Sequence, residues 1–331
     1  MTRRPPHIGV SFHRTCMAIV GSLLASVAGY AAAQTYPVKP VRLIAPFPAG
    51  GSNDLVSRTI AQKLGERWPN QMIVDNRPGA GGNLGTEIVA HATADGYTLL
   101  MGSSQLAVNA TLYPKLSFNA ATDFAPITLV GSSVHVLCVN PTVPAQTVKE
   151  LIEIAKAKPG QLNYASGGAG SPLHMNAELF GIMTGTRMIH VPYKGGPPAV
   201  AAVLANEAQV VFGSTTTIMP HLKSGRLRAL GVSSGKRSRV LPDVPTIAEA
   251  GVPGYELVNW YGIVAPARTP PAIVSRLNTD IVWAVNAPDT SERITAAGVE
   301  PNTSTATQFS EYFKSELRKW GDLIRTTGLK P

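Results

Sequence analysis

Five glycine-rich loops carry the residue types in this sequence that could bind a ligand. They read PAGGSND (48–54), RPGAGGN (77–83), SGGAGS (166–171), PYKGG (192–196) and GSTT (213–216). Glycine lets a backbone approach a ligand closely, and the unpaired N–H groups of a helix start attract anions. Serine and threonine hydroxyls there can cap the helix or donate to a carboxylate. The chemistry that these loops favour is the binding of a small anion.

Each loop follows a short apolar run and precedes a segment with a helical pattern. The apolar runs are VRLIAPF (41–47), MIVDN (72–76), LNYAS (162–166), MIHVPY (188–193) and QVVFGS (209–214). Such runs are typical of buried parallel strands, and parallel α/β sheets bind ligands at the carboxyl ends of their strands. A single loop of this kind is equally compatible with a tight turn. Five loops at one edge favour a ligand site.

Strands and helices alternate along most of the chain, which predicts an α/β fold with parallel sheets and right-handed crossovers. A second unit starts near Thr147, which forms a capping-box pattern with Glu150. Further strands are predicted at TLLMGS (98–103) and LRALGVS (227–233). The last segment is predicted to be a helix packed in the core, because apolar residues recur on one face at Phe309, Phe313, Leu317, Trp320 and Ile324.

Three cationic or metal-ligating side chains could act in or beside the loops. His174 and Glu178 are four residues apart and could share a helix face as metal ligands, but no His-Glu-x-x-His pattern surrounds them. His174 follows Ser171 closely and is better placed to donate to an anion, or to serve a capping or core role. Lys194 lies inside one of the glycine-rich loops and either pairs with a carboxylate or is solvated. We expect no bound metal.

Nucleotide binding and catalysis lack supporting motifs. The glycines at 79–81 would need Gly or Ala at position 84 for a dinucleotide fingerprint, and Leu84 is there. The stretch GVSSGK (231–236) is one residue short of a phosphate-binding loop. No Gly-x-Ser-x-Gly nucleophile elbow occurs in the sequence. We therefore expect no cofactor and no catalytic residues.

The chain has a formal net charge of +9, but its 29 Lys and Arg residues are scattered. Because no basic stripe with interleaved aromatic residues occurs, the composition argues against nucleic-acid binding. Trp260 and Tyr261 are expected to pack in the core or to form an aromatic pocket wall.

The N-terminus has the order of a secretory signal peptide. Arg3, Arg4 and Arg14 precede the apolar run 16–28, and small residues follow at 31–33. The alternative of a buried N-terminal helix fits this order less well. Removal of residues 1–33 leaves Cys138 as the remaining cysteine, in an apolar run that favours a core role. The sequence predicts an exported, periplasmic protein.

The ordered blocks resemble the Bug family, the extracytoplasmic receptors of tripartite tricarboxylate transporters. The resemblance runs from about residue 36 to the C-terminus. The blocks include YPVKPVRLIAPFPAGGSNDLVSR (36–58), DNRPGAGGNLGTEIVA (75–90), DGYTLL (95–100), DFAPITLVGS (123–132), NYASGGAGSPLHM (163–175), HVPYKGGPPAV (190–200), LKSGRLRALGVSS (222–234), LPDVPTIAEAGVPGYE (241–256) and WYGIVAPARTP (260–270).

The resemblance implies a type II periplasmic-binding-protein fold, with two lobes of mainly parallel sheet and a ligand cleft between them. Lobe 1 would comprise 36–136 and 257–331, and lobe 2 would comprise 137–256. The residues that the resemblance assigns to the ligand site are Ala49, Gly50, Gly51, Ser52, Asp54, Ala80, Gly81, Gly82, Asn83, Ser103, Gly168, Ser171, His174, Lys194, Gly195, Ser214 and Thr215. Asp54 would repel an anion, so we expect it to cap its helix and orient the loop.

A receptor of this family would capture a small mono-, di- or tricarboxylate and deliver it to the membrane permease subunits of the transporter, without chemistry. Many relatives carry an acidic residue where this chain has Gly213, and its absence favours plain carboxylates over amino acids. We expect a monomer. Two alternatives stay open: a sensor that reports occupancy to a membrane signalling protein, and an exported hydrolase of small esters.

Overall fold

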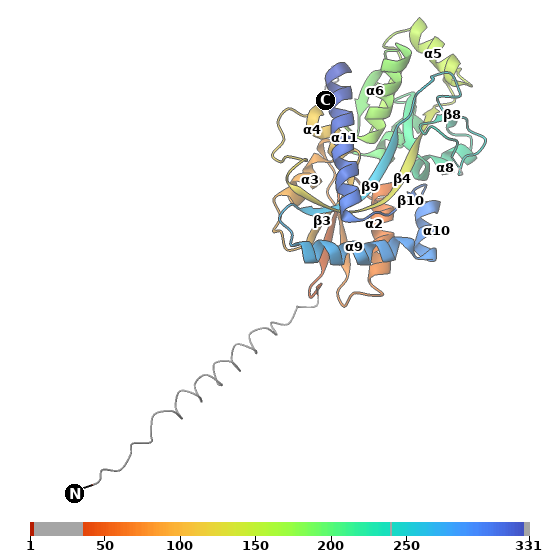
Figure 1. Cartoon of the computed structure of the whole chain (residues 1–331). Helices are drawn as coiled ribbons and strands as arrows, with labels where there is room; N and C mark the ends of the chain where they lie inside the picture. Colours follow the sequence, from red (N-terminus) through yellow and green to blue (C-terminus); the bar gives the residue numbers. More distant parts are fainter. Residues whose placement is uncertain (3–35, 239, 328–331) are drawn as a thin grey trace. The chain divides into compact units, whose positions relative to one another are not determined.

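The computed structural model describes residues 1–2, 36–238 and 240–327 (Figure 1). The predicted signal peptide at 1–33 lies outside these residues apart from its first two positions. The chain divides into a unit at 1–38 and a unit at 39–331, and every element named below belongs to the second. Within the described ranges, no helix is both long and apolar enough to cross a bilayer.

The first half of the fold is a parallel ladder in the order β2-β1-β3. Its strands are β1 (Val41–Ala45), β2 (Met72–Asn76) and β3 (Thr98–Ser103). Its helices are α2 (Ser52–Leu64), the 3-10 turn η1 (Ala80–Gly82), α3 (Asn83–Ala90) and α4 (Gln105–Leu112). The predicted strands are confirmed, although β1 ends two residues early because Pro46 has no N–H to donate to a ladder.

The second half repeats this arrangement, with β6 and β7 parallel to β5 on either side. Its strands are β5 (Asn163–Ser166), β6 (Ile189–Pro192), β7 (Val210–Ser214) and β8 (Arg228–Val232). Its helices are α5 (Val148–Ala157), α6 (Pro172–Thr184), α7 (Gly196–Leu204) and α8 (Thr215–Lys223). The predicted capping box of Thr147 and Glu150 is confirmed, with both reciprocal hydrogen bonds present.

Two long antiparallel strands, β4 (Phe124–Val139) and β9 (Val258–Pro266), join the halves. β4 pairs with β9 as far as Val134 and with β7 from His135 onward. β8 and the short β10 (Glu300–Pro301) also pair with β4. The sequence did not predict these antiparallel pairings, because they connect strands that lie far apart in the chain. The lobe boundaries predicted near 136 and 256 stay a prediction.

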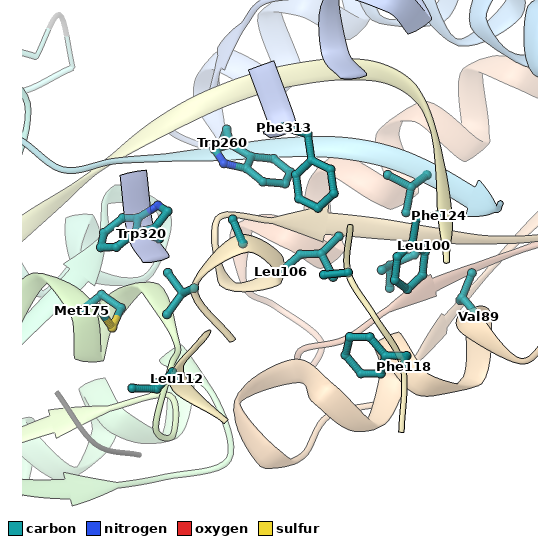
Figure 2. Close-up of a cluster of buried hydrophobic side chains, with 14 of the residues drawn as sticks. Val89, Leu100, Leu106, Leu112, Phe118, Phe124, Met175, Trp260, Phe313 and Trp320 are labelled. Carbon is teal, nitrogen blue, oxygen red and sulfur yellow. The ribbon is translucent and has the colours of Figure 1, made fainter. Parts of the chain in front are cut away.

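The C-terminal helices pack against β4 and against the helices of the first half (Figure 1). They are α9 (Pro271–Asn286), α10 (Pro288–Ala296) and α11 (Ala306–Thr327). The apolar stripe of α11 is confirmed as core, with Leu317 half-buried and its other members buried. Figure 2 shows Phe313 and Trp320 of this helix facing the cluster that contains Trp260. The core role offered for Trp260 is therefore confirmed.

A separate apolar cluster underlies β4, β5 and β7 in the second half, and it includes Cys138. Cys138 is fully buried, and burial raises the pKa of its thiol. The thiol is reduced and unpaired. These features confirm the predicted role of Cys138 as a small core residue.

Candidate functional site

Two adjoining pockets open where the five glycine-rich loops meet, and Phe47 and Gly167 line both. The first, here called the histidine pocket, has an empty volume of about 500 Å³ including the part open to solvent. Its lining comprises Phe47, Pro48, Gly51, Ser52, Asn53, Ser103, His135, Gly167, Ser171, Pro172, Leu173, Gly196, Pro197, Ser214, Thr217, Asn259 and Tyr261. The second, the lysine pocket, is described below.

Four helices begin at the wall of the histidine pocket. They are α2 at Ser52, α6 at Pro172, α7 at Gly196 and α8 at Thr215. The first N–H groups of a helix have no partner within it, and each helix start carries a partial positive charge. The described lining includes neither an acidic residue nor Lys or Arg. An anion in this pocket would therefore be held by peptide dipoles and hydroxyls, without a counter-charge.

The floor of the histidine pocket is the point at which β4 changes neighbours. His135 lies opposite Ser214 of β7, and Ser133 lies opposite Asn259 of β9. The Ser133 hydroxyl lies 3.1 Å from that of Tyr261, and Asn259 accepts a 2.6 Å hydrogen bond from Ser104. Both halves of the fold thus contribute to one polar floor.

Three buried polar atoms at the histidine pocket have no hydrogen-bond partner within the described part of the chain. They are Asn53 Oδ1, Ser103 Oγ and His135 Nδ1. Burial lowers the pKa of His135 to about 4, so its ring is neutral at ordinary pH. Unpaired buried polar groups are uncommon in folded proteins, and each calls for an explanation such as a ligand or an ordered water.

Asp54 has the orienting role that its position in the first loop suggested. Its buried carboxylate accepts from the backbone N–H of Gly50 (3.0 Å) and pairs with Arg58 (2.9 Å). Burial opposes its ionisation, but these hydrogen bonds outweigh that effect and lower the pKa of Asp54. The carboxylate is engaged with the loop and with Arg58, and it lines neither pocket.

His174 supports the glycine-rich loop at 166–171 by a hydrogen bond to its backbone. Its Nδ1 accepts from the N–H of Gly170 (3.1 Å), while Ser171 Oγ accepts from the N–H of His174 (3.4 Å). The ring is buried and packs on His190 with centroids 4.3 Å apart. Burial, and then the proximity of His190, lower the pKa of His174 to about 3. The ring is therefore neutral, and it lies 3.9 Å from Glu178.

The metal site considered for His174 and Glu178 has no further ligand. Within the described residues, no group of three or more His, Cys, Asp or Glu side chains could hold an ion. Glu178 instead accepts from the Tyr164 hydroxyl.

The lysine pocket has a different lining, made mostly of glycine-rich backbone. It comprises Phe47, Pro78, Gly79, Ala80, Gly81, Gly82, Tyr113, Gly167, Gly168, Ala169, Pro192, Tyr193 and Lys194. Its empty volume is about 680 Å³, again including the open part. Lys194 is exposed at this pocket and is its charged lining residue.

The halves of the fold touch at the lysine pocket. The Tyr113 hydroxyl of the first half donates to the Ala169 carbonyl of the second (2.9 Å). Gly81 has φ +62°, and a Cβ at that position would overlap the Ala169 carbonyl oxygen. A second contact between the halves lies at the histidine pocket, where Ser52 Oγ and Thr216 Oγ1 are 2.7 Å apart. Close approach of the two glycine-rich loops thus depends on the absence of a side chain at position 81.

The structure places the predicted site residues in two groups. Those that line a pocket are Gly51, Ser52, Ser103, Ser171 and Ser214 in the histidine pocket, and Ala80, Gly81, Gly82, Gly168 and Lys194 in the lysine pocket. Those that line neither are Ala49, Gly50, Asp54, Asn83, His174, Gly195 and Thr215.

Members of the second group support the loops. Asn83 Oδ1 accepts from Asn109 Nδ2 (2.7 Å), and the hydroxyl of Thr215 donates to the Gly298 carbonyl (3.3 Å). Gly195 packs against Pro48, so a Cβ there would overlap the Pro48 ring.

Sequence reasoning missed the floor of the histidine pocket. His135, Thr217 and Asn259 were not among the predicted site residues, and Tyr261 was offered only as a wall or core residue. One signal was available: His135 is a polar residue inside the apolar run that contains Cys138. A buried histidine in such a run needs a reason, and a pocket is one.

Comparison with known proteins gives concordant matches. The family model of the tripartite tricarboxylate transporter family receptor matches residues 56–329. Protein BugT of Bordetella pertussis is 36% identical over 95% of this chain and 98% of its own. Among solved structures, Rpa4515 of R. palustris with adipate has a TM-score of 0.85 and 33% identity, covering 89% of this chain and 99% of that one.

A second solved relative is MatC from Rhodopseudomonas palustris with bound malate. It has a TM-score of 0.83 and 29% identity, and covers 87% of this chain and 100% of its own. A type II periplasmic-binding-protein fold with two lobes, as predicted, is confirmed by these likenesses. The predicted resemblance to Bug receptors is confirmed as well.

Proposed function

Since this chain belongs to the tripartite tricarboxylate transporter receptor family, we propose that it is a periplasmic receptor that captures a small carboxylate between its lobes and delivers it to membrane permease subunits. The observation that carries the proposal is the convergence of four helix starts on one uncharged pocket. Peptide N–H groups and hydroxyls recognise a carboxylate without a salt bridge, and they allow release once the lobes part.

The solved relatives support the ligand class. One was determined with adipate and another with malate, which are both dicarboxylates. In the described part of the chain, no acidic residue lines the histidine pocket and could pair with an ammonium group. Gly213, at the position where an acidic residue was considered, is buried in β7 against Ile218 of α8 and lines neither pocket. These features favour carboxylates without an amino group.

Export supports the receptor assignment. The basic, apolar and small-residue order of residues 1–33 fits a signal peptide, and the lone mature cysteine fits a protein that needs no disulfide. Membrane permease subunits are the partner that the family implies. We further propose that the receptor performs no catalysis, because within the described residues no hydrogen bond joins the hydroxyl of a pocket serine to a histidine ring or a carboxylate that could activate it.

A binding screen tests this function. The purified mature protein would be titrated by calorimetry with aliphatic mono-, di- and tricarboxylates and with the matching amino acids. We expect at least one carboxylate to bind and to raise the thermal midpoint in a concentration-dependent manner. Absence of binding to every carboxylate, together with turnover of a small ester, would contradict the receptor function and favour the hydrolase alternative.

A further inference from the structure

The three unpaired polar atoms of the histidine pocket come from three separate elements. Asn53 lies in the first turn of α2, Ser103 ends β3, and His135 lies in β4. Their residues are only 5%, 1% and 2% exposed, and all three line the same pocket. A buried polar group without a partner costs stability. Three such groups at one pocket indicate partners that arrive with a ligand.

The orientation of Asn53 defines what one of these partners must supply. Its Nδ2 donates to the Met101 carbonyl at 3.0 Å, which leaves Oδ1 as the unpaired acceptor. A carboxylate has no hydrogen to donate, so it cannot pair with this oxygen. The ligand must therefore carry a hydrogen-bond donor in addition to its carboxylate.

Ser103 and His135 complete a neutral set of donors and acceptors. The Ser103 hydroxyl can donate or accept, and the uncharged His135 ring has one N–H and one lone pair. No nearby carboxylate could pair with a ligand ammonium group: Asp54 pairs with Arg58, and no acidic residue among those that the structure describes lines either pocket. An ammonium donor would be buried there without a counter-charge, whereas a hydroxyl would not.

We propose that Asn53, Ser103 and His135 form a hydroxyl-recognition cluster, which makes this receptor selective for hydroxycarboxylates over the corresponding deoxy compounds. The proposal rests on the carboxylate-receptor function above and names its substrate class. The carboxylate is held by the helix starts, while the cluster pairs with a hydroxyl on the carbon chain. A site built to pair with a hydroxyl rejects the analogue that lacks one, because its buried groups are then left unpaired.

The test uses ligand pairs that differ by one hydroxyl: lactate with propionate, malate with succinate, and 2-hydroxyglutarate with glutarate. Affinities would be measured by calorimetry on the purified mature protein. We expect the hydroxylated member of at least one pair to bind roughly tenfold or more tightly. Equal affinity within every pair, or tighter binding of the deoxy members, would overturn the cluster and leave the receptor function intact. If no carboxylate of any kind binds, the receptor function itself fails.

Two substitutions test whether Ser103 and His135 cause the preference for hydroxylated ligands. Ser103→Ala and His135→Phe each remove an unpaired group and break no side-chain hydrogen bond of the described structure. We expect the hydroxyl preference, which is the ratio of the two affinities, to fall about fivefold to tenfold in each variant, because the hydroxylated ligand loses more affinity than the deoxy ligand. Ser275→Ala, an exposed serine on α9, is the control and should keep the wild-type preference.

Retention of the full preference in both variants would overturn the assignment of these residues. Ser103→Ala also covers the case in which His135→Phe does not fold, because it removes only one oxygen. Ordered water could pair with the same atoms in place of a ligand hydroxyl. In that case the deoxy and hydroxylated ligands would bind alike, which is the outcome that overturns the proposal.

Discussion

The two pockets differ in how they present hydrogen-bonding groups. The histidine pocket combines four helix starts with side chains of Ser, Asn, His and Tyr on strands β3, β4 and β9, and its described lining has no formal charge. The lysine pocket is lined mainly by glycine-rich backbone and has Lys194 at its side. Backbone groups are the same for any sequence that can adopt the loop, whereas side chains differ. Ligand selectivity should therefore depend on the histidine pocket, and lobe closure on the lysine pocket.

The largest expected effect comes from a side chain placed between the loops of the lysine pocket. In Gly81→Ala the new Cβ would overlap the Ala169 carbonyl oxygen, so the lobes could not approach as closely. We expect carboxylate affinity to fall by roughly 100-fold, because closure supplies contacts from both lobes. Isothermal titration calorimetry measures the change.

Gly185→Ala is the matched control for that substitution. Gly185 has φ +64°, close to the +62° of Gly81, but nothing lies within 4 Å of its added Cβ. Both variants should lose a similar conformational stability of ~1 kcal/mol. Equal losses of affinity in the two variants would mean that backbone strain, and not the contact between loops, governs closure.

The neutral ring of His135 predicts how folding stability depends on pH. Its pKa is about 4 in the folded protein against 6.5 for a free histidine, so the unfolded chain binds more protons between these values. The stabilisation is complete above pH 6.5 and is lost as pH falls toward 4. At pH 5 the unfolding free energy should have dropped by ~2 kcal/mol on account of this residue.

Urea unfolding of the wild type and of His135→Phe at pH 7 and pH 5 isolates this contribution. The variant should lose ~2 kcal/mol less than the wild type between the two pH values. His174 and His190 have lowered pKa values as well, so a pH dependence will persist in the variant. An identical pH dependence in both proteins would show that His135 is not buried and neutral.

A smaller effect is expected at the helix cap of the histidine pocket. Ser171 caps α6 and also lines the pocket, so Ser171→Ala should lower stability by ~1 kcal/mol and affinity by about tenfold. Thr147→Ala removes the cap of α5, which lines neither pocket. It should lower stability similarly with no change in affinity. Unchanged affinity in Ser171→Ala would remove this residue from the binding site.

The smallest effect is expected from the exposed charge of the lysine pocket. Lys194→Gln should weaken carboxylate binding about threefold at low salt, and the difference should vanish at high salt because exposed charges are screened. Lys223→Gln, at the end of α8, is an exposed control of the same chemistry. A loss beyond tenfold that persists in high salt would place Lys194 in direct contact with the ligand.

Local sequence signals predicted the parallel halves well. Short apolar runs predicted β2 and β3 to the residue. β3 is buried, as such a run implies, whereas β2 is an edge strand with Ile73 exposed. The capping box of Thr147 and Glu150 was predicted equally well, because it depends on two residues only three positions apart. The loops were identified for the same reason, since glycine and serine mark the turn from strand to helix.

The floor of the site was not predictable in this way. Ser133 and Asn259 become neighbours only through the antiparallel pairing of β4 with β9, and no local period encodes that register. His174 shows a second limit. Its spacing from Ser171 placed it near the loop, but only the structure shows that its ring turns inward to Gly170 and not toward a ligand.

The buried state of Cys138 has a practical consequence for optical detection of ligand capture. A thiolate is the species that reacts with maleimide dyes, and burial both shields this sulfur and suppresses its ionisation. In the mature chain, one cysteine could be introduced on the exposed face of α9 and another on α5. Both would react with the dye while Cys138 stays unlabelled. Energy transfer between the two dyes would then follow lobe closure in single molecules, without removal of a native residue.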